Sequence, residues 1–340
     1  MKLFECQHCG QPLYFENTQC VSCGRALGYL PSMECVTALE DSNGQRRALA
    51  EPRGRYRYCT NAAYDACNWL VRADSPDAFC VACRHNRTVP DLNQWDNVRH
   101  WQRIELAKHR LFYTLLRLRL PLHTKAEDPD GLAFDFLQGP HTFAPSLAPV
   151  WTGHSSGVIT LNISEADDAE RERQRHAMGE PYRTLVGHFR HESAHYFWDR
   201  LVRNSPNLDE YRRIFGDERQ DYGQALQQHY ATGAQPDWPD HFVTSYASSH
   251  PWEDFAETWA HYLHIVDTME MARAFNLHVE PRIDDSGQLE ATIDFNSYKI
   301  ANFQIIVDGW LPVSFAMNNI NRCMGPVSYT HLTLPTNREV

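Results

Sequence analysis

The stretch TLVGHFRHESAHYFWDRLVR, residues 184–203, decides how the rest of the sequence is interpreted. Apolar residues recur through it at helical spacing, which predicts a helix over about 181–204. Inside it lies the pattern H-E-x-x-H, formed by His191, Glu192 and His195. On a helix the two histidines project from one face, one turn apart, and together they can bind one Zn²⁺. Glu192 lies on the rim of that face, where a carboxylate can accept a proton and pass it on.

A catalytic zinc site needs a third protein ligand, and a later stretch offers two candidates. In SYASSHPWEDFAETWAHYLHIVD, residues 245–267, Pro251 starts a predicted helix on which Glu253 and Glu257 share one face. Two carboxylates that face the interior are costly unless a cation or an imidazolium balances them. We expect Glu253 to bind the metal and Glu257 to hold the ring of a metal-bound histidine. The reverse assignment, and an exposed acidic helix start favoured by the helix dipole, both stay open.

A regular group of cysteines lies near the N-terminus. Its spacing is C-x2-C-x10-C-x2-C, in which each C-x2-C pair presents two thiolates from one tight turn: Cys6, Cys9, Cys20 and Cys23. Gly10 and Gly24 directly follow the two pairs, where the turn needs a permissive backbone. Four thiolates predict a closed, structural zinc site. Two disulfides or an iron site are the alternative interpretations.

A second group of cysteines is less regular, because one of its pairs is opened to seven intervening residues. It consists of Cys59, Cys67, Cys80 and Cys83. We expect a second zinc site here, with His85 as a substitute ligand if one of the first two cysteines does not take part. Nine of the ten cysteines lie before residue 84, and the N-terminus has no apolar signal core. We therefore expect a cytoplasmic, reducing location, which favours metal over disulfides.

The distribution of charge excludes some classes of protein. The net charge of −11 is uneven, since residues 1–125 carry 17 Lys and Arg against 12 Asp and Glu, and residues 126–340 carry 15 against 31. The resulting −16 of the second part argues against a nucleic-acid-binding body. A basic region over 46–57 leaves room for a protein partner near the cysteines. No run of about 18 apolar residues exists, so we expect no membrane span.

Changes of pattern along the chain predict five segments. They are a zinc ribbon, a second cysteine-rich zinc-binding module, a helical linker, a main domain and a tail, at residues 1–34, 35–90, 91–125, 126–325 and 326–340. The tail PVSYTHLTLPTNREV has no regular period and resembles translated sequencing-adaptor read-through, so we expect it to be non-native. Other predicted helical segments are one long helix, or two, over 93–120, a looser, polar, helical stretch over 207–235, and a helix over 251–275. Strands are predicted over 53–58, 132–137, 157–164 and 289–296.

These motifs, taken as a set over about residues 3–325, resemble the bacterial family of zinc-binding metallopeptidases with an N-terminal zinc ribbon. H-E-x-x-H followed by a distant glutamate helix resembles the gluzincin clan, and E-D-F-A-E-T-W-A-H-Y-L-H is similar to the ligand helix of lethal-factor-type peptidases. The resemblance implies an α+β fold in which zinc-ribbon modules are joined by a long helix to a zincin-like metallopeptidase domain. In those peptidases a tyrosine seven residues before the ligand glutamate helps polarise the substrate carbonyl. Tyr246 has that spacing, so the resemblance implies a catalytic role for it.

The expected function is hydrolysis of peptide bonds in a peptide or protein substrate, through a zinc-activated water with Glu192 as general base and acid. We expect one catalytic zinc ion and one or two structural ones. The alternative is a zinc-ribbon binding or regulatory protein whose hydrolase site is vestigial or tightly regulated. A zinc hydrolase that acts on a small amide is a further alternative.

Overall fold

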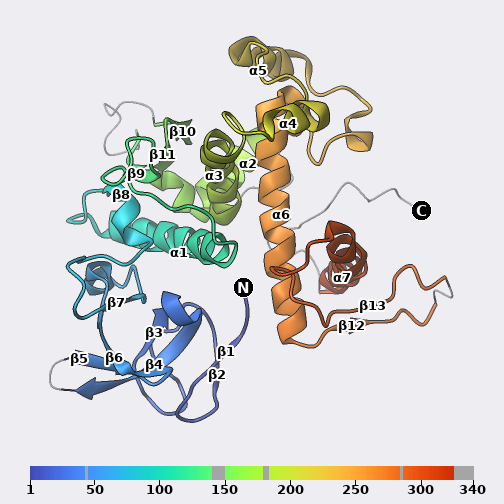
Figure 1. Ribbon diagram of the computed structural model, residues 1–340. Coiled ribbons are helices and arrows are strands. Elements are labelled where there is room, and N and C mark those ends of the chain that lie inside the picture. Colours follow the sequence, from blue (N-terminus) through green and yellow to red (C-terminus); the bar gives the residue numbers. More distant parts are fainter. Residues whose placement is uncertain (43–44, 140–149, 179–183, 284–285, 325–340) are drawn as a thin grey trace. The chain divides into compact units, whose positions relative to one another are not determined.

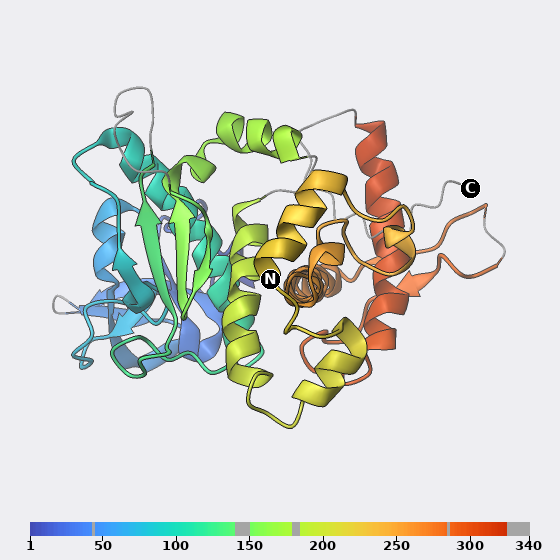
Figure 2. The same ribbon diagram turned by 90° about the horizontal axis from the view of Figure 1, so that it is seen from above.

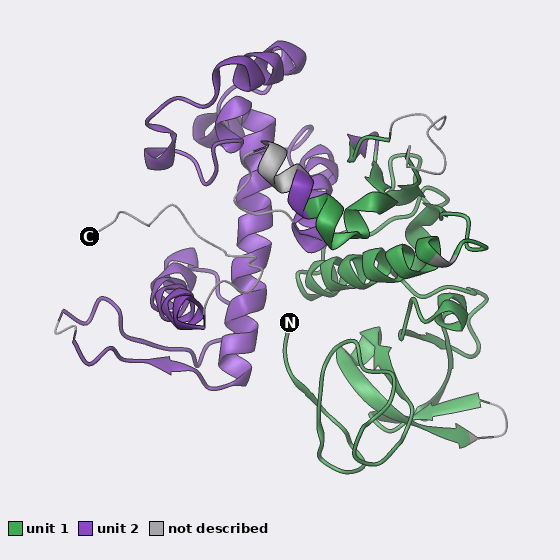
Figure 3. Ribbon diagram, turned by 180° about the vertical axis from the view of Figure 1, so that it is seen from behind, with its two compact units in different colours: residues 1–153, 157–171 green, residues 154–156, 172–340 purple. Residues whose placement is uncertain are grey.

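The computed structural model describes residues 1–42, 45–139, 150–178, 184–283 and 286–324, and it divides into two compact units (Figure 3). The first unit is Met1–Gly153 with Gly157–Arg171, and the second is His154–Ser156 with Glu172–Val340. The chain passes between the units at two elements, β10 (Gly153–Ser155) and α2 (Asp168–Met178). The predicted non-native tail, 326–340, lies outside the described residues.

The first unit begins with two small antiparallel arrangements of strands. β1 (Phe4–Glu5) pairs with β2 (Pro12–Leu13). A five-stranded sheet follows in chain order (Figure 1): β3 (Leu27–Leu30), β4 (Cys35–Ser42), β5 (Gln45–Ala48), β6 (Glu51–Tyr58) and β7 (Leu70–Arg72). Three short 3-10 helices lie among these strands or follow them: η1 (Pro31–Met33), η2 (Thr60–Tyr64) and η3 (Cys83–His85).

A long helix and a parallel sheet complete the first unit. The helix predicted over 93–120 is α1 (Trp95–Arg117), which Figure 2 shows beside the strands β8 (Asn86–Thr88), β9 (Ala133–Leu137) and β11 (Val158–Asn162). β9 is the middle strand of these three and pairs in parallel with both of its neighbours. Phe112 of α1 contacts Phe134 of β9, with ring centroids 5.9 Å apart. The 3-10 helix η4 (Ile163–Ala166) follows β11.

The second unit is mainly helical. Its helices are α3 (Leu185–Leu201), α4 (Leu208–Phe215), α5 (Tyr222–Thr232), α6 (Pro251–Ala274) and α7 (Phe303–Cys323). Two 3-10 helices, η5 (Trp238–Asp240) and η6 (Ala247–Ser249), and an antiparallel pair, β12 (His278–Val279) and β13 (Ala291–Thr292), complete it. α6 is the central helix of the unit (Figure 1). Its buried residues Val266 and Met269 pack in one core with Ile306 and Trp310 of α7.

The α+β class is confirmed, but several predicted elements have other bounds. α3 begins at Leu185, where the side chain of Thr184 accepts the N–H of Gly187 at 3.0 Å and caps the helix. The start predicted at Pro181 lies outside the described residues. The looser helical stretch predicted over 207–235 consists of the two helices α4 and α5. Of the strand predicted over 289–296, only Ala291–Thr292 pairs. Among the described residues, no helix combines the length and the apolar composition that crossing a membrane requires.

Candidate active site

The two histidines of the H-E-x-x-H pattern lie on α3. Their ring centroids are 5.1 Å apart, which is the separation expected for residues one turn apart on a helix. Neighbours on the same helix are fully buried and fix its orientation: Phe189, Ala194 and Phe197. His195 is itself buried, whereas His191 is partly exposed. Hydrophobic burial of α3 therefore holds both imidazoles in place.

α6 brings a carboxylate to these rings. Pro251 at its first position and His250, whose Nδ1 accepts the N–H of Trp252 at 3.0 Å, start the helix so that Glu253 lies in its first turn. Glu253 is 1% exposed, and its Oε2 lies 3.0 Å from Nε2 of His191. Its Oε1 lies 3.7 Å from Nε2 of His195. The three donor atoms lie within 4.8 Å of one another.

Glu257, one turn further along α6, contacts the other nitrogen of the same ring. Its Oε1 lies 2.6 Å from Nδ1 of His191, and its Oε2 accepts the hydroxyl of Thr244 at 2.9 Å. His191 is thus held between two carboxylates, with Nδ1 directed to Glu257 and Nε2 directed to Glu253. This is the arrangement in which an outer carboxylate orients a metal-binding histidine.

The charges of the group depend on one another. Burial alone would lower the pKa of His191, but the carboxylates of Glu253 and Glu257 raise that pKa well above its ordinary value. Burial would raise the pKa of Glu253, but its contact with His191 lowers that pKa to about 2. Burial lowers the pKa of His195 to about 3. His195 is therefore a neutral imidazole, Glu253 is a carboxylate, and His191 holds a proton that it shares with the carboxylates. A divalent cation bound by these three residues can replace that proton.

The donor atoms suit zinc in type and in spacing. Zinc bound to nitrogen and oxygen at about 2.0–2.2 Å in a tetrahedron separates neighbouring donors by about 3.3–3.6 Å. The distances of 3.0 Å and 3.7 Å from Glu253 to the two histidines lie on either side of this range. The 3.7 Å separation is too long for a hydrogen bond, so the carboxylate and His195 do not satisfy each other. The three residues therefore fit a shared ion.

Two tyrosines approach the same group. The hydroxyl of Tyr222 on α5 donates to Oε1 of Glu253 at 2.7 Å. The ring of Tyr246, which directly precedes η6, has its centroid 6.0 Å from that of His191. Burial and the nearby Glu253 raise the pKa of both phenols above the ordinary value. Each hydroxyl therefore keeps its proton and can donate a hydrogen bond.

Tyr222 and Thr244 are functional candidates that sequence reasoning missed. Tyr222 precedes Glu253 by 31 positions and begins a short polar helix with no metal-binding pattern. Thr244 lies in a loop before η6, and its contact with Glu257 depends on how that loop folds back on α6. No spacing rule connects either residue with H-E-x-x-H, so no signal in the sequence indicated them.

The first cysteine group converges as well. Sγ of Cys6 lies 3.8 Å from that of Cys23, and Sγ of Cys9 lies 3.6 Å from that of Cys20. These distances approach the edge of about 3.8 Å in a tetrahedron of four sulfurs at 2.3 Å from zinc. The two glycines that follow the pairs have φ of 75° and 71°, in the left-handed region that the turns require: Gly10 and Gly24.

The second cysteine group is fully buried. All four sulfurs lie within 4.8 Å of one another, and those of Cys67 and Cys80 are 3.8 Å apart. His85, the substitute ligand expected from the sequence, is not among these donors. Its Nδ1 instead donates to the carbonyl of Leu132 at 2.8 Å, and its ring packs on Phe112 with centroids 5.0 Å apart.

Comparison with known proteins agrees with the two kinds of site. A family model described as "Putative zinc-binding metallo-peptidase" matches residues 97–337, and a model described as a zinc-ribbon domain matches residues 3–94. The chain belongs to this metallopeptidase family. The resemblance to the family of zinc-binding metallopeptidases with an N-terminal zinc ribbon is thereby confirmed.

Similar proteins occur in mycobacteria. An uncharacterized protein of Mycobacterium bovis and uncharacterized proteins of two strains of Mycobacterium tuberculosis are each 40% identical to the chain over 338 residues. The alignment covers 98% of this chain and 91% of each relative. No solved structure matches the chain.

Proposed function

We propose that the protein is a zinc-dependent metallopeptidase of the gluzincin type that hydrolyses peptide bonds in a peptide or protein substrate. Membership of the family supports this proposal. The observation that carries it is the position of the buried Glu253 carboxylate between His191 and His195, at 3.0 Å and 3.7 Å. These three residues would hold the catalytic ion, with Glu257 orienting His191.

The remaining residues of the site have roles that follow from their chemistry. Zinc held by two imidazoles and a carboxylate supplies Lewis acidity and lowers the pKa of a water towards about 7. Glu192, on the same helix as both histidines, would accept a proton from the attacking water and give it to the leaving amine. Tyr246, whose pKa burial raises, would donate a hydrogen bond to the substrate carbonyl as negative charge develops on its oxygen.

The cysteine groups would hold one or two structural zinc ions. The sulfur–sulfur distances in the first group, 3.8 Å and 3.6 Å, support a four-cysteine site formed by Cys6, Cys9, Cys20 and Cys23. Cys59, Cys67, Cys80 and Cys83 supply the sulfurs of the second group. Metal bound there would add to the stability of a segment that is too small to form a large core.

The alternative of a binding or regulatory protein receives less support. Two arginines of the basic region expected to contact a partner already form ion pairs, Arg46 with Asp41 at 2.8 Å and Arg47 with Glu40. Their charge is therefore partly neutralised by carboxylates of the neighbouring strand β4. The cytoplasmic location and the five-segment division of the chain stay predictions.

Cleavage of an unstructured protein tests the proposed function. We expect the zinc-loaded chain to cleave casein slowly, and Glu192→Gln to abolish the cleavage while the bound zinc, counted by elemental analysis, is unchanged. Glu210→Gln on the surface of α4 is the matched control and should leave cleavage unaltered. Equal activity of wild type and Glu192→Gln would rule the mechanism out.

A further inference from the structure

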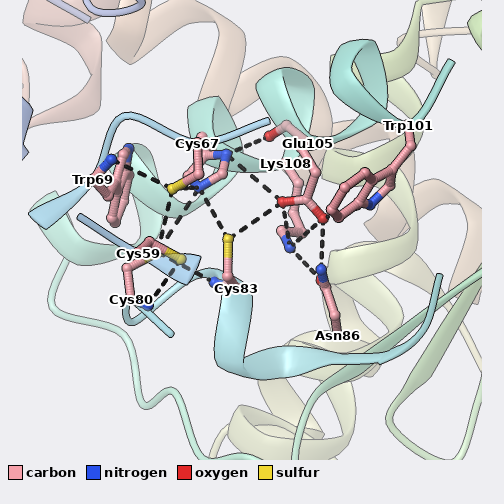
Figure 4. A network of polar contacts seen from close by, with 10 residues as sticks. Cys59, Cys67, Trp69, Cys80, Cys83, Asn86, Trp101, Glu105 and Lys108 are labelled. Atoms are coloured by element: carbon pink, nitrogen blue, oxygen red, sulfur yellow. Dashed lines mark hydrogen bonds and ion pairs between the residues drawn. The ribbon is translucent and has the colours of Figure 1, made fainter. Parts of the chain in front are cut away.

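A buried imidazole lies against the second cysteine group, whose four cysteines are labelled in Figure 4 together with Glu105 and Lys108. It belongs to His109 of α1, and its Nε2 lies 3.3 Å from Sγ of Cys67, 3.6 Å from that of Cys83 and 3.9 Å from that of Cys80. The group therefore offers five donor atoms, whereas a structural zinc ion takes four. All of these residues belong to the first unit.

The distances match the edges of a coordination tetrahedron. A sulfur at about 2.3 Å and a nitrogen at about 2.0–2.1 Å from zinc are separated by about 3.6 Å, and two sulfurs by about 3.8 Å. The three distances from His109 average to the first value, and the 3.8 Å between Cys67 and Cys80 equals the second. A metal ion can therefore lie between these cysteines and the imidazole.

The other ring nitrogen determines which atom carries the proton. Nδ1 of His109 lies 2.6 Å from the backbone carbonyl oxygen of Glu105, which can only accept a hydrogen bond. Nδ1 therefore bears the hydrogen, and in the neutral ring Nε2 presents its lone pair to the sulfurs. A backbone carbonyl on the second nitrogen is a common partner of metal-binding histidines.

Buried charges favour the imidazole over a fourth thiolate. The side chains of Glu105 and Lys108 are fully buried 2.9 Å apart and cancel each other's charge, and Oε2 of Glu105 lies 3.5 Å from Sγ of Cys83. Zinc with four thiolates carries a charge of −2, whereas zinc with three thiolates and a neutral imidazole carries −1. Uncompensated buried charge is costly, so the set with histidine is the less costly one.

We propose that the second metal centre binds zinc through Cys67, Cys80, Cys83 and His109. Cys59 lies outside this set, and its sulfur accepts the backbone N–H of Cys80 at 3.3 Å. The cysteines lie within the segment matched by the zinc-ribbon model and His109 within the segment matched by the metallopeptidase model. The ion thus joins the two segments, whether or not the chain hydrolyses peptides.

Cadmium-113 NMR of the full-length wild-type chain tests this ligand set without a substitution. The resonance of bound ¹¹³Cd²⁺ moves with the number of thiolate ligands, and each site gives its own signal. Beside a signal without sulfur ligands from the active site, we expect one signal typical of four sulfurs, from the first cysteine group, and one typical of three sulfurs and one nitrogen. Two signals typical of four sulfurs would overturn the proposal.

A matched pair of variants gives an independent readout. Cys59→Ser should keep its second structural zinc ion during competition with a chelator. His109→Ala should lose that ion at least tenfold faster, and added imidazole should restore its retention. The opposite pattern, with zinc lost from Cys59→Ser and kept by His109→Ala, contradicts the proposed ligand set. If His109→Ala does not fold, the cadmium spectrum of the wild type decides.

Discussion

Glu253 and Glu257 lie one turn apart on α6 and contact different nitrogens of the same histidine ring. If Glu253 binds the metal and Glu257 only orients His191, the two substitutions to glutamine should differ. Glu253→Gln should lose the catalytic zinc ion. Glu257→Gln keeps one oxygen acceptor for Nδ1 but loses the charge, so we expect zinc affinity to fall about 10–100-fold. Competition with a chromogenic chelator measures both.

Glu210→Gln on the exposed face of α4 serves as the control for this pair and should bind zinc as the wild type does. Loss of the ion from Glu257→Gln, with only a weakened site in Glu253→Gln, would show the reverse assignment, which the sequence left open.

Tyr222 and Tyr246 should differ in what their hydroxyls support, zinc binding for Tyr222 and catalysis for Tyr246. Tyr222 donates to Glu253 at 2.7 Å, so Tyr222→Phe should lower zinc affinity about tenfold, the effect of one hydrogen bond to a charged group of about 1.5 kcal/mol. Tyr246→Phe should leave the zinc content unchanged and lower kcat by about 10²–10³, as loss of an oxyanion donor does. Equal kcat values for Tyr246→Phe and wild type would contradict its proposed role.

Sequence reasoning succeeded where a local pattern brings side chains together. H-E-x-x-H and C-x2-C each predict that two side chains converge, because helix and turn geometry relate residues three or four positions apart. The sequence alone could not decide whether Glu253 or Glu257 is the metal ligand, since both share one face and only tertiary packing sets their distances to His191. Tyr222 and His109 approach their groups from other helices, and no periodicity encodes that contact.

Thr184 is the N-cap of α3 and satisfies a backbone N–H of its first turn. The hydroxyl of Thr184 accepts the N–H of Gly187 at 3.0 Å, and His191 lies two turns further on. Thr184→Ala should lower the free energy of unfolding by about 1 kcal/mol, whereas Thr184→Ser keeps the acceptor and should cost only a few tenths. Urea denaturation at saturating zinc measures the difference. Equal losses in both variants would show that the cap does not stabilise α3.

A charged pair connects two parallel strands of the first unit. Arg87 of β8 donates to both oxygens of Asp135 of β9, at 2.9 Å for the longer contact. Burial would raise the pKa of Asp135, but Arg87 holds it below the ordinary value. Because the Arg87 side chain is 55% exposed, solvent screens the pair, and Asp135→Asn should cost only about 0.5–1 kcal/mol.

The pH dependence of this pair follows from the direction of the shift. A carboxyl with a depressed pKa stabilises the folded state above its unfolded pKa of about 3.9 and loses that contribution as the pH falls through the folded value. The difference in unfolding free energy between wild type and Asp135→Asn should therefore stay constant from about pH 5 to pH 8. Urea titrations at several pH values measure it, and a difference that falls within this window would contradict the assignment.

Elements whose stability comes from tertiary packing were the ones that the sequence did not predict. α7 contains Gly309 and Pro312, which normally indicate a break in a helix. A Cβ added at Gly309 would lie 3.0 Å from Cε of Met269, so the glycine serves the close approach of α7 to α6. The short strands β3, β5 and β7 have no alternation long enough to detect and are fixed by their neighbours in the sheet.

For the whole molecule, the proposals together require three zinc ions per chain, bound at separate sites. Three single substitutions should each remove one ion, since Cys9, Cys83 and His195 belong to three different donor groups. Cys9→Ser and Cys83→Ser should also lower the thermal midpoint of unfolding, because the binding energy of a structural ion is folding energy. His195→Ala should remove activity with a smaller effect on that midpoint. Elemental analysis after gel filtration, with calorimetry on the same samples, measures both quantities. Cys83 binds the ion in either ligand set of the second centre. If the wild type bound only two zinc ions per chain, and Cys83→Ser bound the same number, the second centre would be eliminated. The active site and the first cysteine group would then be the two sites that bind zinc.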